Sequence, residues 1–222
     1  MLKLVRGIFV VAALLASVSV GMPPAHAAAC PDVDVTFARG TEEPPGVGRI
    51  GQSFINSLRA DVRGKSVGVY AVNYPAIKNW ATAAQGVADA SAHILFMATN
   101  CPRTRLVIGG YSQGASVVNA VTADALPPLF APPFGSGPPL PPFAADRVVS
   151  VALFGIPSLD YLNSAGAPPV STGGRYAAKV LNMCLPDDPV CSIGGRNDAA
   201  HNAYAENGMT AQTAWVTAQR LG

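Results

Sequence analysis

Residues 110–114, Gly-Tyr-Ser-Gln-Gly, are the part of this sequence best suited to chemistry. They follow an apolar run at 106–108 and precede a helical pattern over 115–125. A Gly-x-Ser-x-Gly sequence between a strand and a helix is typical of a sharp turn that lifts a serine hydroxyl above a sheet edge. Glycines flank such a turn because side chains there would meet the neighbouring strand or helix. We therefore predict that Ser112 is a nucleophile for acyl transfer; the alternative is a glycine-rich turn with an incidental serine.

A serine hydroxyl becomes a good nucleophile only when a neighbouring base removes its proton. The chain has three histidines. His26 lies in an N-terminal leader, and His93 lies in an Ala-rich helical pattern where an ordinary helical histidine is the simpler interpretation. His201 follows the last predicted strand and therefore belongs to the same sheet edge as Ser112. We predict that His201 is the base.

The carboxylate that orients this base is expected between the serine and the histidine in chain order. Asp187 and Asp188 lie between the last two cysteines, in a short loop that a disulfide would make rigid. The alternative interpretation is that both aspartates only form a turn. Asp198, close to His201, is a further candidate for the acid. The residue pattern alone leaves the choice between Asp187 and Asp188 open.

Two donors are expected to stabilise the oxyanion of a tetrahedral intermediate. The backbone N–H of Gln113, directly after the serine, is the first. The second is expected from the loop after the first predicted strand, where Thr41 offers both an N–H and a hydroxyl. A turn or helix cap is the alternative role for Thr41.

Apolar side chains in two loops on the same side are candidates to contact an acyl group. Tyr74, Ile77 and Trp80 lie in the loop after the second predicted strand, and Ile193 lies shortly before His201. Ordinary core packing is an equally good interpretation for each aromatic residue.

The surrounding pattern alternates apolar strands with helices. Strands are predicted over residues 33–37, 67–72, 105–109, 148–154 and 176–182, and helices over 51–62, 81–99, 115–125 and 202–220. Such alternation predicts an α/β fold, a three-layer sandwich around a central, mainly parallel five-stranded sheet. Residues 126–143 contain eight prolines; they join a helix to a strand, so we expect a rigid extended surface loop away from the serine.

The first 27 residues predict a signal peptide. Lys3 and Arg6 precede an apolar stretch and an Ala-His-Ala cleavage site at 25–27, with cleavage after Ala29 as an alternative. The alternatives to a cleaved signal peptide are a retained membrane anchor and a lipid-modified Cys30. Residues 28–222 are then one catalytic domain, and we expect it to be secreted, extracellular or associated with the cell envelope.

The net charge and the cysteines limit the kinds of partner and ligand that we expect for this chain. Without the leader the chain has thirteen basic and thirteen acidic residues, which argues against nucleic-acid binding. Four cysteines in an exported chain predict two disulfides, Cys184–Cys191 across a short loop and therefore Cys30–Cys101. A zinc site is the alternative, but no Cys-x-x-Cys pair exists and histidines are few. We expect no metal and no cofactor, an ester as substrate, transient contact with lipid surfaces, and a monomer.

Taken together, these motifs resemble the cutinase family, small disulfide-bonded serine esterases of the α/β-hydrolase class. The resemblance rests on residues 38–42 (Ala-Arg-Gly-Thr-Glu), 110–115, 184–191 and His201, in that order. It implies that Asp188 rather than Asp187 is the acid, since the family's acid stands three residues before the second cysteine of the small loop. It also implies Thr41 and Gln113 as the oxyanion hole, and the same two disulfides.

The resemblance implies hydrolysis of soluble, lipid or polyester esters through an acyl-enzyme. Acyl transfer to an alcohol and carbohydrate acetyl-ester hydrolysis are alternatives that use the same three residues. A catalytically silent secreted surface protein is the alternative from another functional class.

Overall fold

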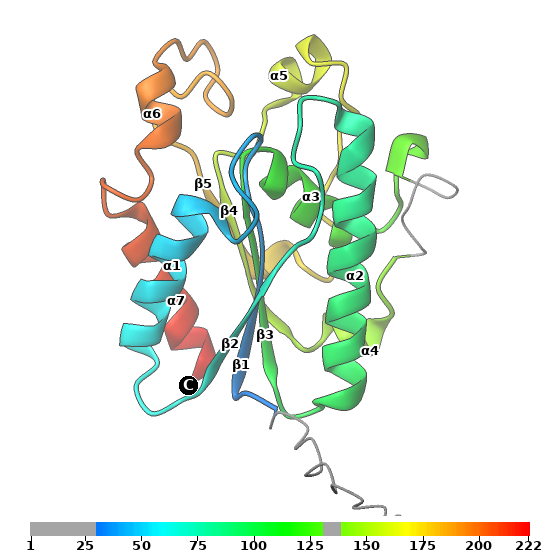
Figure 1. Ribbon diagram of the computed structural model, residues 1–222, viewed down its shortest axis with the longest axis vertical. Coiled ribbons are helices and arrows are strands. Elements are labelled where there is room, and N and C mark those ends of the chain that lie inside the picture. Colours follow the sequence, from blue (N-terminus) through cyan, green and yellow to red (C-terminus); the bar gives the residue numbers. More distant parts are fainter. Residues whose placement is uncertain (1–29, 131–138) are drawn as a thin grey trace, which may run out of the picture.

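One parallel β-sheet runs through the centre of the molecule. The computed structural model describes residues 30–130 and 139–222, so the predicted signal peptide lies outside the described residues. The five strands pair in the order β2-β1-β3-β4-β5, and every pairing is parallel (Figure 1). They are β1 (Val33–Ala38), β2 (Val67–Ala71), β3 (Arg105–Tyr111), β4 (Val148–Phe154) and β5 (Val180–Met183). The predicted fold class is confirmed.

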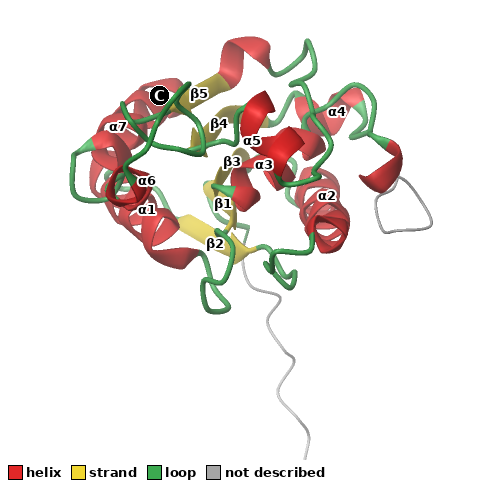
Figure 2. Ribbon diagram, turned by 90° about the horizontal axis from the view of Figure 1, so that it is seen from above, coloured by secondary structure: helices red, strands yellow, loops and turns green. Residues whose placement is uncertain are grey.

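Helices cover both faces of this sheet. On one face lie α1 (Gly48–Asp61) and α7 (Met209–Leu221); on the other lie α2 (Ala83–Asn100) and α3 (Gln113–Val121) (Figure 2). The shorter helices are α4 (Pro142–Ala145), α5 (Leu159–Ser164) and α6 (Asp198–Asn202). Every residue of β1 and β4 is buried, because apolar side chains of these central strands enter a core on each face.

Each face of the sheet has its own hydrophobic core. Phe37, Phe54 and Phe154 meet beneath α1, with ring centroids 5.8 to 6.4 Å apart. Ile94 and Leu106 are buried in the core beneath α2 and α3. Burial on both faces fixes the strand positions, and with them the loops at the carboxyl edge of the sheet.

Several predicted boundaries were wrong. The predicted helix over 115–125 is α3, which begins at Gln113 and ends at Val121. The predicted last strand, 176–182, begins only at Val180, because residues 177–179 form a 3-10 turn in which the Lys179 N–H donates to the Tyr176 carbonyl. The predicted helix over 202–220 begins only at Met209, as α7; Asn202 is the last residue of α6, and residues 203–208 separate the two helices. The break ends at Gly208, whose φ of 87° is left-handed and stops continuous helical geometry.

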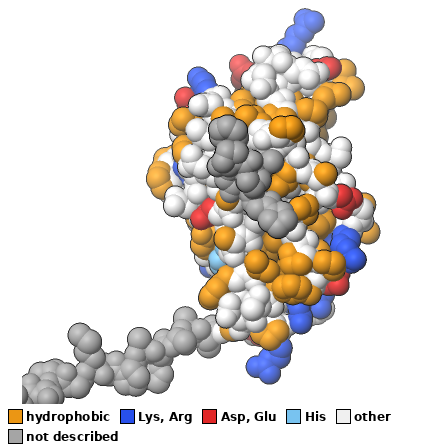
Figure 3. All heavy atoms as spheres, turned by 90° about the vertical axis from the view of Figure 1, so that its right-hand side faces the viewer, with side chains coloured by type: hydrophobic (Ala, Val, Ile, Leu, Met, Phe, Trp, Pro, Cys, Tyr) orange, Lys and Arg blue, Asp and Glu red, His pale blue; other side chains and the backbone are white. Residues whose placement is uncertain are grey.

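The proline-rich segment also differs from the predicted extended loop. Residues 128–130 form a 3-10 helix that buries Phe130, and α4 begins directly after Pro141. Residues 131–138 of that segment lie outside the described residues. On this side of the molecule, Figure 3 shows hydrophobic side chains spread over the surface, and Phe96 of α2 and Phe143 of α4 are exposed.

Both predicted disulfides are confirmed. Cys30 bonds to Cys101 and ties the start of β1 to the end of α2, and Cys184 bonds to Cys191 directly after β5. Within the described ranges, no helix is both long enough and apolar enough to cross a bilayer.

Candidate active site

Ser112 lies at the carboxyl edge of the sheet, between β3 and α3, and its backbone is strained. Its φ of 54° and ψ of −119° lie outside the regions that residues other than glycine normally adopt. Such a conformation costs roughly 1–3 kcal/mol and persists only where the surroundings enforce it. Here the Ser112 N–H donates to the Phe154 carbonyl at 2.9 Å, and the Ala115 N–H donates to the Ser112 carbonyl at 2.9 Å. This is the strand-to-helix turn that the sequence predicted.

The two flanking glycines are required by space. A Cβ atom on Gly110 would lie 2.2 Å from the Gly114 carbonyl oxygen, and one on Gly114 would lie 2.1 Å from the Ala38 carbonyl oxygen. Both obstacles are backbone atoms, one in the turn between β3 and α3 and one at the end of β1, so no side-chain rotation relieves the clash. The helix can therefore start directly against the sheet, which holds the serine above the edge.

His201 lies beside the serine. Its Nε2 is 3.0 Å from Ser112 Oγ, and its Nδ1 is 2.9 Å from Asp188 Oδ2. Because the ionised carboxylate can only accept, Nδ1 carries the proton of the neutral imidazole and the Nε2 lone pair faces the serine hydroxyl. The Tyr111 hydroxyl donates to the His201 carbonyl at 2.8 Å, which fixes the end of α6 against β3. This geometry allows the imidazole to take the serine proton.

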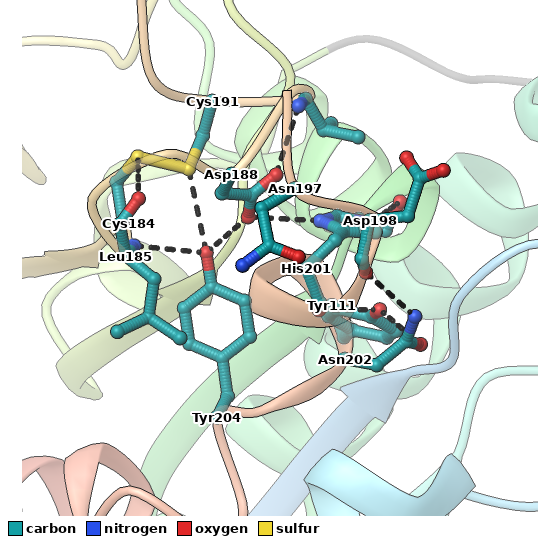
Figure 4. A network of polar contacts seen from close by, with 12 residues as sticks. Tyr111, Cys184, Leu185, Asp188, Cys191, Asn197, Asp198, His201, Asn202 and Tyr204 are labelled. Atoms are coloured by element: carbon teal, nitrogen blue, oxygen red, sulfur yellow. Dashed lines mark hydrogen bonds and ion pairs between the residues drawn. A yellow bond between two sulfur atoms is a disulfide. The ribbon is translucent and has the colours of Figure 1, made fainter. Parts of the chain in front are cut away.

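Asp188 is fully buried and its carboxylate is well supplied with donors. Oδ1 accepts from the Val190 N–H at 2.8 Å, and Oδ2 accepts from the Tyr204 hydroxyl at 2.5 Å as well as from His201 (Figure 4). Burial by itself raises the pKa of this carboxyl, but the bonds from His201, Tyr204 and Val190 outweigh burial and hold its pKa below the ordinary value. Asp188 is therefore ionised at neutral pH.

The other two candidate acids have different partners. Asp187 has a φ of 65°, and its Oδ1 accepts the Arg196 N–H at 2.9 Å, so it is the turn-forming member of the pair. Asp198 opens α6, and its carbonyl accepts from the Asn202 side chain at 3.0 Å. Of the three aspartates proposed from the sequence, Asp188 is the one that bonds to His201.

The two predicted oxyanion donors come from two separate segments, the start of α3 and the loop after β1. Gln113 is the first residue of α3, so its backbone N–H has no acceptor within the helix. Its side chain donates from Nε2 to the Ile77 carbonyl at 2.8 Å, which ties the turn to the loop after β2. Thr41 is half-buried in the loop after β1. Their roles toward substrate stay predictions.

A buried guanidinium holds the loop that contains Thr41. Arg39 is only 5% exposed, and it donates to the carbonyls of Glu43 at 2.9 Å and Tyr74 at 2.6 Å. The Glu43 carboxylate in turn accepts the Gly40 N–H at 2.7 Å. These charge-assisted bonds fix both ends of residues 39–43 without any help from Thr41.

Comparison with known proteins settles the family. The family model described as Cutinase matches residues 29–220. The chain belongs to the cutinase family. It is 49% identical over 178 residues to "Probable carboxylesterase Culp5" of Mycobacterium tuberculosis, covering 79% of this chain and 99% of that protein. It is 47% identical over 219 residues to "Phospholipase Culp4" of the same organism, covering 99% and 91%.

A solved structure of an acetylxylan esterase shares the fold of this cutinase-family chain. The two superpose with a TM-score of 0.72 at 25% identity, covering 87% of this chain and all of the esterase. Together with the carboxylesterase relatives, the family match shows that the chain is an ester-hydrolysing enzyme.

The residues predicted to contact an acyl group take different places in this esterase. Tyr74 is 4% exposed and its hydroxyl donates to the Arg39 carbonyl at 2.5 Å, so the prediction that it contacts substrate is corrected: it supports the Arg39 loop. Trp80 begins a short 3-10 helix and is half-buried. Ile193 is 92% exposed and Ile77 is 45% exposed. These last three remain candidates.

Tyr204 is a residue of the site that sequence reasoning missed. Its side chain is buried, and its hydroxyl contacts Asp188 Oδ2 as described above. The predicted continuous helix over 202–220 hid it, because a residue near the start of an amphipathic helix has no evident reason to point toward the acid. Its spacing of three from His201 was the available signal.

Among the residues that the structure describes, no three His, Cys, Asp or Glu side chains are grouped so that they could hold a metal ion. Ser112, His201 and Asp188 form a hydrogen-bonded chain of hydroxyl, imidazole and carboxylate, an arrangement that can carry out acyl transfer without a metal ion.

Proposed function

We propose that this chain is a secreted serine carboxylesterase in which Ser112, His201 and Asp188 form the catalytic triad. The observation that carries the proposal is the unbroken hydrogen-bonded chain, 3.0 Å from Ser112 Oγ to His201 Nε2 and 2.9 Å from His201 Nδ1 to Asp188 Oδ2. Nucleophile, base and orienting acid are thus all within hydrogen-bonding reach. Two disulfides support export into an oxidising compartment.

In this mechanism, Ser112 Oγ attacks the ester carbonyl carbon while His201 Nε2 takes the hydroxyl proton. The resulting oxyanion accepts bonds from the Gln113 N–H and from Thr41. His201 then gives the proton to the departing alcohol, which leaves an acyl group on Ser112. A water molecule, deprotonated by His201, attacks that acyl group; His201 then returns the proton to Ser112 Oγ as the acid leaves. Asp188 holds the imidazole tautomer and stabilises the imidazolium throughout.

Esters with an apolar acyl group are the proposed substrates. Ile77, Leu159 and Ile193 are large apolar side chains, 45%, 58% and 92% exposed, in segments that follow β2, β4 and β5. Exposed apolar side chains around a nucleophile suit lipid or polyester acyl groups and transient contact with a lipid surface. The name of the Culp4 relative, a phospholipase, agrees with this class.

Acetyl-ester hydrolysis on a carbohydrate is the second candidate. It is favoured by the structural similarity to an acetylxylan esterase. Acyl transfer to an alcohol uses the same acyl-enzyme, and added alcohols that yield transfer products would identify it.

The decisive experiment is a panel of p-nitrophenyl esters from acetyl to palmitoyl, together with a phospholipid, a polyester and acetylated xylan. Ser112→Ala is the blank, and its kcat/KM should fall by roughly 10⁴-fold or more. Rates that rise with chain length support the lipid class, whereas strict acetyl preference supports the carbohydrate esterase. Ordinary activity in Ser112→Ala would end the proposal.

A further inference from the structure

The hydroxyl of Tyr204 occupies the centre of the polar network behind the imidazole (Figure 4). It lies 2.5 Å from Asp188 Oδ2, accepts the Leu185 N–H at 3.2 Å, and lies 3.3 Å from Cys191 Sγ. A phenol has a single hydrogen, and the carboxylate can only accept. The hydrogen therefore goes to Asp188, and the Leu185 N–H occupies a lone pair of the phenol oxygen.

The Tyr204 ring is held as firmly as its hydroxyl. The residue is fully buried, and its ring packs edge-on against Phe154 at 6.2 Å and Tyr111 at 6.1 Å between centroids. Gly155 gives it room, since a Cβ atom there would lie 3.1 Å from the Tyr204 hydroxyl and 3.0 Å from His201 Cε1. A fixed ring delivers the hydroxyl to one place.

We infer that Tyr204 is a fourth member of the catalytic unit, a positioning residue whose hydroxyl fixes Asp188 Oδ2 and weakens the hold of that oxygen on the His201 proton. The inference rests on the proposed triad. Its basis is that one carboxylate oxygen, Oδ2, receives both the Tyr204 hydroxyl and His201 Nδ1. Each donor draws charge from that oxygen, so the strength of one bond depends on the other.

The groups that titrate around Tyr204 are few. Asp188 and His201 face it, and Tyr111 is the neighbouring phenol; the exposed Arg49–Glu206 pair lies at the outer side of the loop that carries Tyr204. Burial, followed by the bond to Asp188, raises the pKa of Tyr204, and burial raises the pKa of Tyr111. Both phenols thus keep their hydrogens over the pH range in which an esterase is assayed.

The test compares Tyr204→Phe with the wild type in kcat, KM and the pH profile of kcat/KM. Without the hydroxyl, the carboxylate is less well fixed and Oδ2 binds the imidazolium more strongly. We expect kcat to fall about 10- to 100-fold with KM changed less than about threefold. We also expect the acid limb of kcat/KM to move to higher pH by about 0.5 to 1 unit.

The chain offers a matched control in Tyr176. It is also buried, 4% exposed, but its hydroxyl has no hydrogen-bond partner among the described residues. Tyr176→Phe deletes the same atom and should leave kcat/KM and the acid limb within about twofold and 0.1 unit of the wild type. An unmoved acid limb in Tyr204→Phe would overturn the inference, whether kcat is unchanged or lowered, because a purely structural role alters stability without altering the titration of the base.

A second variant covers the case in which Tyr204→Phe does not fold. Site-specific 3-fluorotyrosine at position 204 keeps the shape and the hydroxyl but makes it a stronger donor. The acid limb should then move to lower pH, opposite to the Phe variant, and an unchanged limb would again reject the inference. Ser112→Ala is assayed in parallel: activity there contradicts the triad, whereas an inactive Ser112→Ala with an ordinary Tyr204→Phe contradicts only the role of Tyr204.

Discussion

Asp187 and Asp188 are adjacent carboxylates in one loop, and their surroundings give them different tasks. Asp187 is left-handed and bonds to the backbone of Arg196, which closes the turn. Asp188 points inward to three donors and is fully buried. The two residues are of the same type, so their different roles come from the hydrogen-bond donors around each carboxylate.

This difference predicts a contrast between two conservative variants. Asp188→Asn should lower kcat/KM by roughly 10³- to 10⁴-fold, because the amide can present an N–H to His201 and favour the wrong tautomer. Asp187→Asn should retain activity within about threefold, because asparagine tolerates the left-handed region and keeps an acceptor oxygen for Arg196. Esterase kinetics on purified, folded variants measure both. Equal losses in the two variants would contradict the assignment of Asp188.

Protonation of Asp188 should also appear in the stability of the fold. Its pKa is held below 3.8 in the folded protein, so its stabilising contribution is complete above about pH 5 and is lost as the pH falls through 3.8 toward the lowered value. We expect the difference in unfolding free energy between wild type and Asp188→Asn to shrink between about pH 5 and pH 3. Denaturant titrations at several pH values measure it, and a constant difference would show that Asp188 is not preferentially ionised in the fold.

At this scale the sequence predicted the serine and the histidine and left the acid open. Ser112 is marked by its flanking glycines, and His201 was the one histidine placed at the correct sheet edge. Asp188 came from a family resemblance, since adjacent aspartates in a loop give no periodic signal. Tyr204 was missed and Tyr74 was misassigned, because exposure of an aromatic side chain in a loop depends on tertiary packing.

Contacts between backbone atoms shape the turn between β3 and α3, and only glycines at 110 and 114 leave room for them. The carbonyl oxygens of Gly114 and Ala38 occupy the space where side chains at 110 and 114 would go. Helix α3 and strand β1 therefore touch through backbone atoms. Residue choice at 110 and 114 is set by this contact rather than by chemistry with substrate.

Gly114→Ala should therefore destabilise the fold strongly. The added methyl group would lie 2.1 Å from the Ala38 carbonyl oxygen, and relief requires α3 to move away from β1. We expect a loss of about 3 kcal/mol or more in unfolding free energy, together with most of the activity. Gly174→Ala is the matched control, because nothing lies within 4 Å of a Cβ there and its backbone is not left-handed. A stable, active Gly114→Ala would show that the turn between β3 and α3 can accommodate a methyl group.

Elements were predictable where apolar periodicity was strong. All five strands exist, because β-branched apolar runs such as β4 have no other good environment than a buried sheet. The start of β5 and the break between α6 and α7 were not predictable from periodicity. Both depend on single turn bonds, such as the one from the Met209 N–H to Asn207 Oδ1 at 2.9 Å.

The whole molecule is closed by two disulfides that differ in what they constrain. Cys30–Cys101 spans 71 residues and joins the first strand to the end of α2, whereas Cys184–Cys191 spans 7 residues and encloses Asp188. A chain-entropy treatment gives about 4 kcal/mol for the long link and about 2 kcal/mol for the short one. The long link should act mainly on stability, and the short one on the acid.

Removing each disulfide separately should show which one mainly stabilises the fold and which one mainly supports activity. The double variant Cys30→Ala/Cys101→Ala is expected to lose about 4 kcal/mol of unfolding free energy but to keep kcat/KM within about threefold wherever it is folded. Cys184→Ala/Cys191→Ala is expected to lose less stability and to lower kcat/KM about 10-fold or more, since the loop around Asp188 is released. Melting curves and ester hydrolysis measure both. Full activity in the second variant would show that Tyr204 and the backbone hold Asp188 unaided.

The C-terminus and the start of β1, which follows Cys30 by three residues, lie at the amino-terminal ends of the strands (Figure 1), whereas Ser112 follows the carboxyl end of β3. Cys30 is pinned there by Cys101, and the Gly222 carbonyl oxygen accepts from Lys65, two residues before β2. A tether, fusion partner or solid support attached beside Cys30 or at Gly222 thus holds the enzyme at the sheet edge opposite Ser112. The esterase can be immobilised or displayed in that way with Ser112 turned away from the support.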